Sequence, residues 1–122
     1  MNKTKLVIPL LLVLGTIGCS APVSLIDYYT LYPPYEISDN YCLICKLSSE
    51  GDPKIDSVKY LRWSKKMIII QQTNSSWWVI KAYGDVLCCG HGDTTIGPLD
   101  DKAVQPYFSE MTDVIQEMYV SF

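Results

Sequence analysis

Hydrophobic and polar positions in the middle of the chain follow the patterns of β-strands. Residues 67–72 (MIIIQQ) form a short β-branched run, typical of a strand that is buried on both faces. Residues 57–63 alternate in side-chain character, which suits a strand with both faces partly covered. Residues 41–47 indicate a further strand, and the turn-forming residues 48–53 end it.

Two more strands are expected to complete a meander. Residues 77–83 (WWVIKAY) follow a polar turn at residues 73–76. The pair Gly84 and Asp85 has glycine first, as a type II′ hairpin turn requires. The pattern therefore predicts that residues 86–89 run back beside 77–83, and that residues 66–72 form the other strand of a three-stranded antiparallel meander.

The C-terminal part of the chain has a helical pattern. Asp100 and Asp101 can cap the free N–H groups of a helix start. Pro106 is tolerated only near that start, so the regular helix is expected over about 105–119. Its apolar stripe consists of Phe108, Met111, Thr112, Ile115, Met118 and Tyr119. The predicted fold class is α+β, a small antiparallel β-meander sheet with one C-terminal helix packed on a face.

Composition limits the size of the protein and its partners. The chain has 122 residues, of which 48% are hydrophobic, so one folded domain is expected. It carries 10 Lys and Arg against 13 Asp and Glu, a formal net charge of −3. Because nucleic-acid-binding surfaces are strongly basic, we expect no nucleic-acid partner.

The N-terminal residues 1–18 have the form of a secretory signal peptide. Lys3 and Lys5 precede the uncharged apolar run 6–18, which is shorter than the ~20 residues that a membrane-spanning helix needs. The alternatives are a short membrane anchor and a buried N-terminal helix. Pro9 and Gly15 inside the run disfavour a regular buried helix.

Residues 16–20 (TIGCS) resemble the lipobox of bacterial lipoproteins. Gly18 and Cys19 match the family pattern, while Thr16 stands where the family usually has Leu. The resemblance implies that the signal peptide is removed and that Cys19 receives a diacylglycerol thioether and an acyl chain such as palmitate. At about 0.8 kcal/mol per buried CH₂, two or three chains would hold the protein permanently on a membrane.

The residue after Cys19 indicates which membrane is expected. Ser20, rather than Asp, implies the outer membrane of an enteric-type bacterium, with the domain in the cell envelope and facing the periplasm. The alternative is ordinary signal-peptide cleavage after Ala21, which would place Pro22 directly after the cut, where it is poorly tolerated.

The predicted organisation is a signal peptide over 1–18, a lipid-attached tether over 19–27 and a single small α+β domain over 28–122. The mature part also resembles small, functionally uncharacterised bacterial envelope lipoproteins, whose pattern has a Trp and Ile-rich strand, an aromatic strand and a Gly-Pro-Leu stop before a C-terminal helix. The corresponding residues here are Trp63, Ile68, Ile69, Gln71, Trp77, Trp78, Gly97, Pro98 and Leu99. This resemblance carries no activity with it.

Four cysteines remain once Cys19 is assigned to lipid: Cys42, Cys45, Cys88 and Cys89. In an oxidising compartment we expect two disulfides between the first and second pairs, each closing a loop of about 45 residues and contributing roughly 3 to 4 kcal/mol. Two bridges require one segment to bend, because both pairs point to opposite faces of a straight strand. Otherwise only one bridge forms, or Cys42 pairs with Cys45.

The cysteines also allow an alternative chemistry. With His91 they supply soft donors for zinc, although adjacent Cys88 and Cys89 rarely bind one ion together. A redox centre at Cys42 and Cys45 would lack the helix N-terminus that activates thioredoxin-like thiols. His91 is the single histidine, so it would be the base of any Ser or Cys hydrolase, yet no known catalytic motif accompanies it. We therefore expect no catalytic residues, no metal and no cofactor.

Binding is the leading functional hypothesis. Aromatic rings exposed on a rigid sheet would form the apolar patch that marks a binding site. The candidates are Trp63, Trp77, Trp78 and Tyr83. The expected role is that of an inhibitor, an immunity or exclusion factor, or an accessory factor, acting on an envelope protein partner; a spacer attached to the outer membrane is a structural alternative. The alternative chemical function is a thiol- or zinc-dependent envelope protein using Cys42, Cys45, Cys88, Cys89 and His91.

Overall fold

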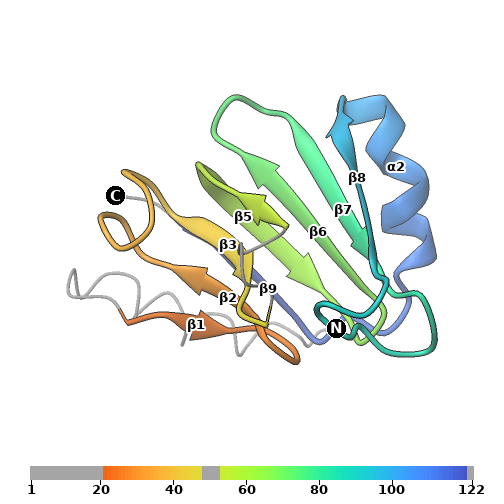
Figure 1. Ribbon diagram of the computed structural model, residues 1–122. Helices are drawn as coiled ribbons and strands as arrows, with labels where there is room; N and C mark the ends of the chain where they lie inside the picture. Colours follow the sequence, from red (N-terminus) through yellow and green to blue (C-terminus); the bar gives the residue numbers. More distant parts are fainter. Residues whose placement is uncertain (1–20, 48–52, 121–122) are drawn as a thin grey trace.

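The computed structural model describes residues 21–47 and 53–120. In these ranges the chain forms two antiparallel sheets and one helix, α2 (Figure 1). The predicted fold class, a small α+β domain with antiparallel strands and a C-terminal helix, is confirmed. The predicted signal peptide over 1–18 and the lipid-bearing Cys19 lie outside the described residues.

The larger sheet has five strands in the order β8-β7-β6-β5-β9. Their bounds are β5 Val58–Trp63, β6 Met67–Gln72, β7 Trp77–Lys81, β8 Thr94–Leu99 and β9 Gln116–Tyr119. Each strand is antiparallel to its neighbours. Strands β5, β6 and β7 lie where the hydrophobic pattern predicted them.

The smaller sheet has four strands in the order β1-β2-β3-β4. Their bounds are β1 Val23–Ser24, β2 Tyr29–Tyr32, β3 Cys42–Cys45 and β4 Lys54–Ile55. Strand β1 lies within the segment 19–27 that was expected to be a tether, and its residue Val23 pairs with Leu31 of β2. Regular structure therefore begins before residue 28.

The predicted third strand of the meander, residues 86–89, is wrong. Those residues belong to the loop 82–93 between β7 and β8, and β8 pairs with β7 in their place. The loop turns away from β7 because the Leu87 N–H bonds to the Lys65 carbonyl at 2.7 Å and Cys89 is covalently linked to β3. The expected hairpin turn at Gly84 and Asp85 does not form, since no strand follows it.

The predicted helix over 105–119 is wrong at both ends, because α2 spans Asp101–Glu110. The Asp100 carboxylate caps it by accepting the Ala103 N–H at 2.7 Å, and the chain leaves helical geometry at Met111. The residues after it form β9, which pairs with β5. In β9 and just beyond, buried Met118 and Val120 alternate with exposed Tyr119, which is the period of two of a β-strand. The segment can therefore pair with the edge of β5 that would otherwise lack a partner strand.

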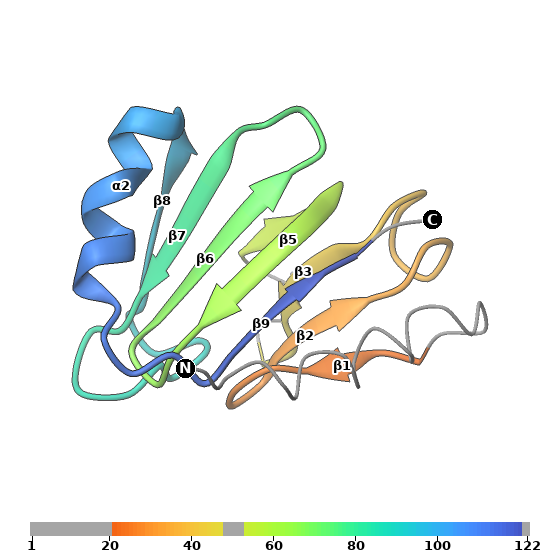
Figure 2. The same ribbon diagram turned by 180° about the vertical axis from the view of Figure 1, so that it is seen from behind.

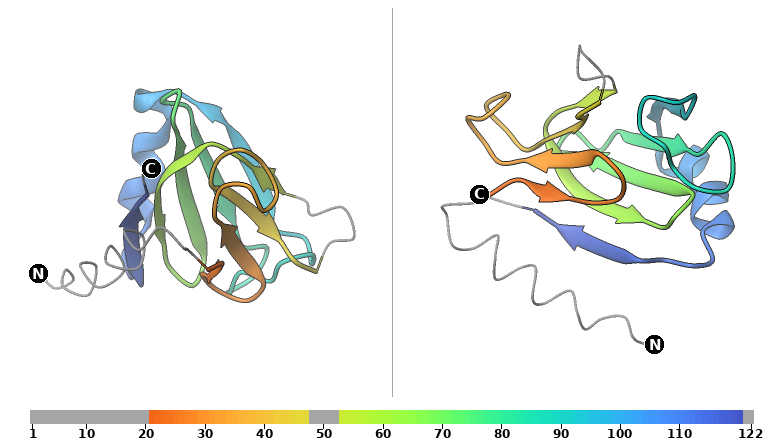
Figure 3. Two further views of the ribbon diagram at one scale, coloured as in Figure 1. Left: turned by 90° about the vertical axis from the view of Figure 1, so that its left-hand side faces the viewer. Right: turned by 60° about the horizontal axis from the view of Figure 1, so that its bottom comes forward.

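The five-stranded sheet lies between two layers, as the left view of Figure 3 shows. Its sandwich face packs against the four-stranded sheet through Leu61, Ile68, Ile70 and Ile80. Its helix face packs against α2 through Met67, Ile69 and Val79. No helix in the described part of the chain is long and apolar enough to cross a membrane.

Candidate functional site

The helix face is only partly covered. Helix α2 contacts β7 and β8 and leaves the β5 and β9 side of the same face uncovered (Figure 2). On this side, Tyr119 of β9 is in register with Tyr60 of β5. Tyr60 is in register with Gln71, and Gln71 with Trp77. One row of side chains therefore crosses the open side and reaches the edge of α2.

The aromatic rings of this row contact one another. The ring centroids of Tyr119 and Tyr60 are 4.8 Å apart, and those of Tyr60 and Trp77 are 5.9 Å apart. On α2, the ring of Phe108 meets Trp77 edge-on at 5.3 Å. We name Tyr60, Trp77, Phe108 and Tyr119 the aromatic cluster. Ring pairs at such distances stabilise the fold by about 0.5 to 1.5 kcal/mol beyond the effect of their buried area. The rings of the cluster are therefore held in place before any partner binds.

An ion pair lies beside the aromatic cluster. The Arg62 Nη1 atom is 3.5 Å from the Glu117 Oε1 atom, and both side chains are 28% exposed. The Arg62 guanidinium also lies 5.6 Å from the ring centre of Phe108, within the range of a cation–π contact. The Tyr60 hydroxyl donates to Glu117 Oε2 at 3.3 Å. The open side thus combines apolar rings with one positive and one negative group.

The hydroxyl of Tyr60 keeps its proton. Burial raises the pKa of Tyr60, the nearby Arg62 guanidinium opposes that rise, and the Glu117 carboxylate adds to it. Tyr60 is 5% exposed while Tyr119 is 60% exposed, so their contact joins a buried ring to an exposed one. Tyr119 has the most exposed ring of the cluster, since Trp77 and Phe108 are half-buried.

Trp77 is the one predicted binding residue that the structure places in the aromatic cluster. Its ring is half-buried, and its Nε1–H donates to Asp101 Oδ1 at 2.8 Å in the first turn of α2. This bond fixes the indole against the helix. Sequence reasoning missed Tyr119 and Phe108 as site residues, because it treated both as core positions of one long helix. The signal that could have found Tyr119 is the period-two alternation of residues 117–120.

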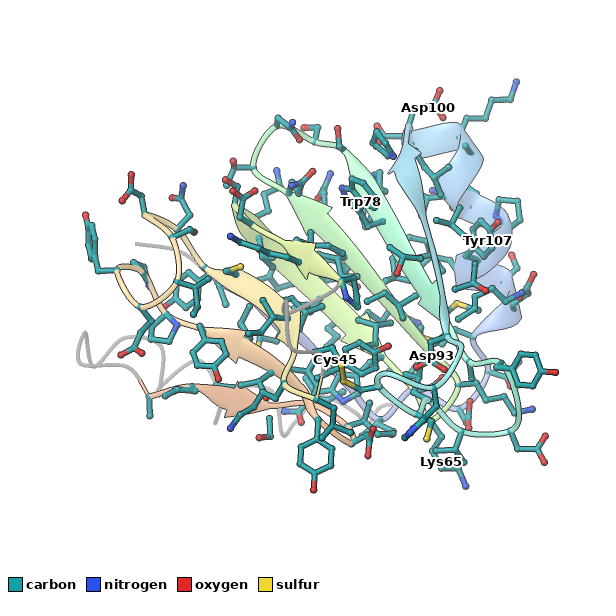
Figure 4. All side chains as sticks on the ribbon, in the orientation of Figure 1. Cys45, Lys65, Trp78, Asp93, Asp100 and Tyr107 are labelled. Atoms are coloured by element: carbon teal, nitrogen blue, oxygen red, sulfur yellow. A yellow bond between two sulfur atoms is a disulfide. The ribbon has the colours of Figure 1, made fainter. Side chains whose placement is uncertain are left out.

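Trp63 and Trp78 lie on the sandwich face. Trp63 is 2% exposed and belongs to the core, so its ring is not part of any surface of the folded domain. Trp78 is half-buried against the same core, and its Nε1–H donates to Gln72 Oε1 at 2.8 Å (Figure 4). Trp77 and Trp78 are neighbours on β7 and point to opposite faces of the sheet, so they do not share a surface.

Tyr83 is 85% exposed, in the loop 82–93. This loop follows the end of β7 at Lys81, whereas Trp77 is at the start of that strand. The structure therefore does not bring Tyr83 together with the aromatic cluster.

The cysteines form one bridge between the expected segments rather than two. Cys45 of β3 is bonded to Cys89 of the loop, with Cα atoms 5.7 Å apart. Cys42 and Cys88 are free thiols. Cys42 is buried, and burial raises the pKa of its thiol. It lies three residues before Cys45 on one strand and so points to the other face, which leaves it unable to reach the loop.

Asp93 organises the loop from within. Its Oδ2 atom accepts the Tyr29 hydroxyl at 2.8 Å and the Cys88 N–H at 3.0 Å, and its Oδ1 atom accepts the Tyr83 N–H at 3.3 Å. Burial raises the pKa of Tyr29, and the bond to Asp93 adds to that rise, so this hydroxyl remains a donor. Figure 4 shows Cys45 and Asp93 at the same end of the molecule.

A pocket of about 360 Å³ opens beside the loop, lined by Tyr29, Pro53, Gly90, Gly92, Asp93 and Thr95. The Cys88 Sγ atom lies 3.2 Å from the His91 Nδ1 atom, and both residues are exposed. Among the described residues, no three His, Cys, Asp or Glu side chains are grouped so as to hold a metal ion. The described residues therefore provide no ligand set for the zinc-dependent alternative.

Comparison of the chain with protein-family models, with curated proteins and with solved structures gives no match.

Proposed function

We propose that the protein is a binding module of the cell envelope, attached to a membrane by lipid on Cys19, and that the aromatic cluster is its binding surface. The observation that carries the proposal is the ring of Tyr119, which is 60% exposed and contacts the ring of a buried tyrosine at a centroid distance of 4.8 Å. Rings held by packing supply large contact area at a low cost in conformational entropy. The protein would act as an inhibitor, an immunity or exclusion factor, or an accessory factor.

The chemistry of this surface favours a protein partner. Interfaces between proteins have an apolar centre of aromatic residues with a polar rim, and Arg is enriched there as well. Here Tyr119 and Phe108 supply the apolar centre, and the Arg62–Glu117 ion pair supplies the rim. We therefore propose an envelope protein that inserts an apolar side chain beside Tyr119 and hydrogen-bonds to the ion pair.

Site-specific crosslinking in cells tests the surface. A photoreactive phenylalanine analogue would replace Tyr119, and in separate strains the control positions Tyr35 and Tyr83, which are each 85% exposed on loops. We expect one discrete crosslinked species from position 119 and none from the controls. Crosslinks from position 83 alone would assign binding to the loop 82–93, and crosslinks from no position would overturn the binding proposal.

Affinity for the crosslinked partner then tests the energetics. We expect Tyr119→Ala to weaken capture by at least about tenfold, as truncation of a central interface aromatic does. The matched control Tyr35→Ala removes an equally large exposed ring from the loop between β2 and β3 and should leave capture unchanged. Equal capture by both variants would exclude the aromatic cluster as the contact surface.

The membrane attachment is tested separately by intact-mass analysis of protein extracted from membranes. The proposal predicts a chain from Cys19 to Phe122 with three acyl chains and the mass deficit of one disulfide. A chain without lipid, cut elsewhere or retaining residues 1–18, would overturn the anchor while leaving the crosslinking test of the surface intact.

A further inference from the structure

The loop 82–93 contains two reactive side chains, Cys88 and His91, which lie away from the aromatic cluster. Residues 88–91 form a tight turn in which the His91 N–H donates to the Cys88 carbonyl at 2.8 Å. Gly90, the third residue of the turn, has φ of +86°, a left-handed conformation that glycine adopts without strain. The turn brings the first and last side chains together, and the Cys88 Sγ atom lies 3.2 Å from His91 Nδ1.

A thiol beside an imidazole is the arrangement that produces a cysteine nucleophile. The thiolate is the reactive form of cysteine, and a base within hydrogen-bond reach can take the thiol proton as the sulfur attacks. Nδ1 of His91 is within that reach. Cys88 is also exposed, whereas Cys42, the other free thiol among the described residues, is fully buried. The two free cysteines therefore differ sharply in access and in the presence of a base.

Three interactions hold the backbone around Cys88 in place. Its own N–H bonds to Asp93 Oδ2 at 3.0 Å, and the N–H of Cys89 bonds to Asp27 Oδ2 at 2.7 Å. The Cys45–Cys89 disulfide fixes the next residue to β3. The pocket of about 360 Å³ is lined by Gly90 and Gly92, the residues on either side of His91. A small molecule that reacts at Cys88 thus meets a rigid turn; the pocket lies next to this turn and is lined by neither Cys88 nor His91.

We propose that Cys88 is a thiol-exchange site for low-molecular-weight disulfides, with His91 as its base. The Cys88 sulfur attacks one sulfur of the disulfide RSSR while its proton moves to His91 Nδ1. The S–S bond of the reagent breaks, a new S–S bond joins Cys88 to RS, and the departing RS⁻ takes the proton from His91 as RSH. Cys88 is oxidised and the departing half of the reagent is reduced, so electrons and protons balance. This activity goes beyond the proposed binding function and does not depend on it.

The rate of modification tests the proposal. Full-length protein with Cys19 replaced by Ser in every sample, so that no cysteine outside the described residues can react, would be incubated in detergent at neutral pH with bis(2-hydroxyethyl) disulfide, a neutral reagent, and followed by intact mass and peptide mapping. We expect a single adduct on Cys88, removable by dithiothreitol, and none in Cys88→Ser. In His91→Ala the rate should fall by at least about tenfold, a threshold set below the ~10²- to 10⁴-fold that a positioned base typically contributes.

Addition of imidazole separates a base from a structural role. We expect free imidazole to restore much of the lost rate in His91→Ala and to leave the wild-type rate unchanged. If the substitution slowed the reaction only by disordering the turn, free imidazole would not restore the rate. Equal rates in wild type and His91→Ala would overturn the proposal. So would modification of Cys42 in the folded protein, loss of the Cys45–Cys89 bridge, or disulfide-linked dimers in place of the adduct.

Discussion

The two faces of the five-stranded sheet are built by the same strands but are covered to different extents. On the sandwich face, Ile68 and Ile70 are fully buried under a second sheet. On the helix face, Ile69 is equally buried under α2, yet the β5 and β9 side ends in the exposed ring of Tyr119. The sandwich face is buried along β5 and β6, with Trp78 of β7 half-buried and Thr95 of β8 exposed, whereas the helix face is covered over its β7 and β8 side.

The difference follows from the widths of the covering elements. A helix with its side chains is about 10 Å wide and neighbouring strands are about 4.8 Å apart, so one helix covers roughly two strands of a sheet. On the opposite face, the four-stranded sheet and the loop residues Leu87 and Cys89 together bury side chains of β5, β6 and β7. Beyond the strands on which α2 packs, large side chains cover the sheet, among them Tyr60 and Tyr119, whose ring centroids are 4.8 Å apart. Incomplete covering thus creates the surface that we propose for binding.

The largest expected effect comes from removing the disulfide that links the loop 82–93 to β3 on the sandwich face. Replacement of Cys45 and Cys89 together by Ala removes a bridge between residues 44 apart, which should lower the free energy of unfolding by about 4 kcal/mol. Urea denaturation measures the change. The control is Cys88→Ser, which replaces an exposed free cysteine of the same loop and should have little effect. A loss as small as that of the control would show that packing alone holds the sandwich face closed.

The isoleucines of β6 compare the two faces at adjacent positions. Ile68→Ala should cost about 4 kcal/mol, because the flanking sheets cannot move into the cavity. Ile69→Ala should cost about 2 to 3 kcal/mol, because α2 packs on one side only and can shift toward the sheet. Both side chains are fully buried, so exposure does not bias the comparison. Equal costs in urea denaturation would contradict a difference in rigidity between the faces.

Alkaline pH probes one buried tyrosine in each sheet, Tyr29 of the four-stranded sheet and Tyr60 on the helix face of the five-stranded sheet. The pKa values of Tyr29 and Tyr60 are raised above the ordinary value of 10.0, so the folded protein keeps protons that the unfolded chain releases. Stability should therefore be constant below about pH 10 and should fall above it, by up to about 1.4 kcal/mol per pH unit for each tyrosine. Tyr29→Phe and Tyr60→Phe should each reduce this slope in urea denaturation across pH 10. An unchanged slope in both variants would contradict the assignment.

The cap of α2 tests how firmly the helix face is held. Asp100→Ala removes the carboxylate that accepts the Ala103 N–H, and the free energy of unfolding should fall by about 1 kcal/mol. The exposed Asp113, which follows the helix, supplies the control variant Asp113→Ala. If both variants lose the same amount in thermal denaturation, the effect is one of net charge and not of capping.

The smallest effect is expected at the exposed ring. Tyr119→Ala should lower the free energy of unfolding by only about 0.5 kcal/mol, the lower end of the value of an aromatic pair. Circular dichroism and thermal denaturation would measure it. A loss of several kcal/mol would instead assign the ring a structural role, and the loss of partner capture in this variant would then reflect unfolding.

Sequence patterns predicted those elements whose burial repeats regularly. The β-branched run of β6 and the aromatic run of β7 identified both strands, because residue type and the length of a run are local signals. Residues 86–89 imitated a strand, since Leu87 and Cys89 are buried two residues apart, but they fill the core from a loop whose path is set by the bridge to Cys45. A pattern of burial alone does not distinguish a loop that plugs the core from a strand.

The end of the chain misled for a related reason. Met111 and Met118 are both buried, and their spacing fits one helical stripe as well as it fits a helix end followed by a strand. What decides between them is the free edge of β5, a feature of the assembled sheet. Because residues 116–119 were assigned to a helix, the exposed position of Tyr119 could not be predicted, whereas Trp77 could. The contact of Cys88 with His91 likewise required the turn at Gly90 to be recognised.

Strand β1 determines how far the domain can lie from an anchored Cys19. Val23, which is already paired in the sheet, is the fourth residue after Cys19. An extended chain spans at most about 3.5 Å per residue, so the reach is about 14 Å. A lipid on Cys19 would thus keep the edge of the four-stranded sheet close to the lipid headgroups. The domain would then meet its partners by lateral diffusion in the plane of the membrane, within a layer little thicker than the protein itself.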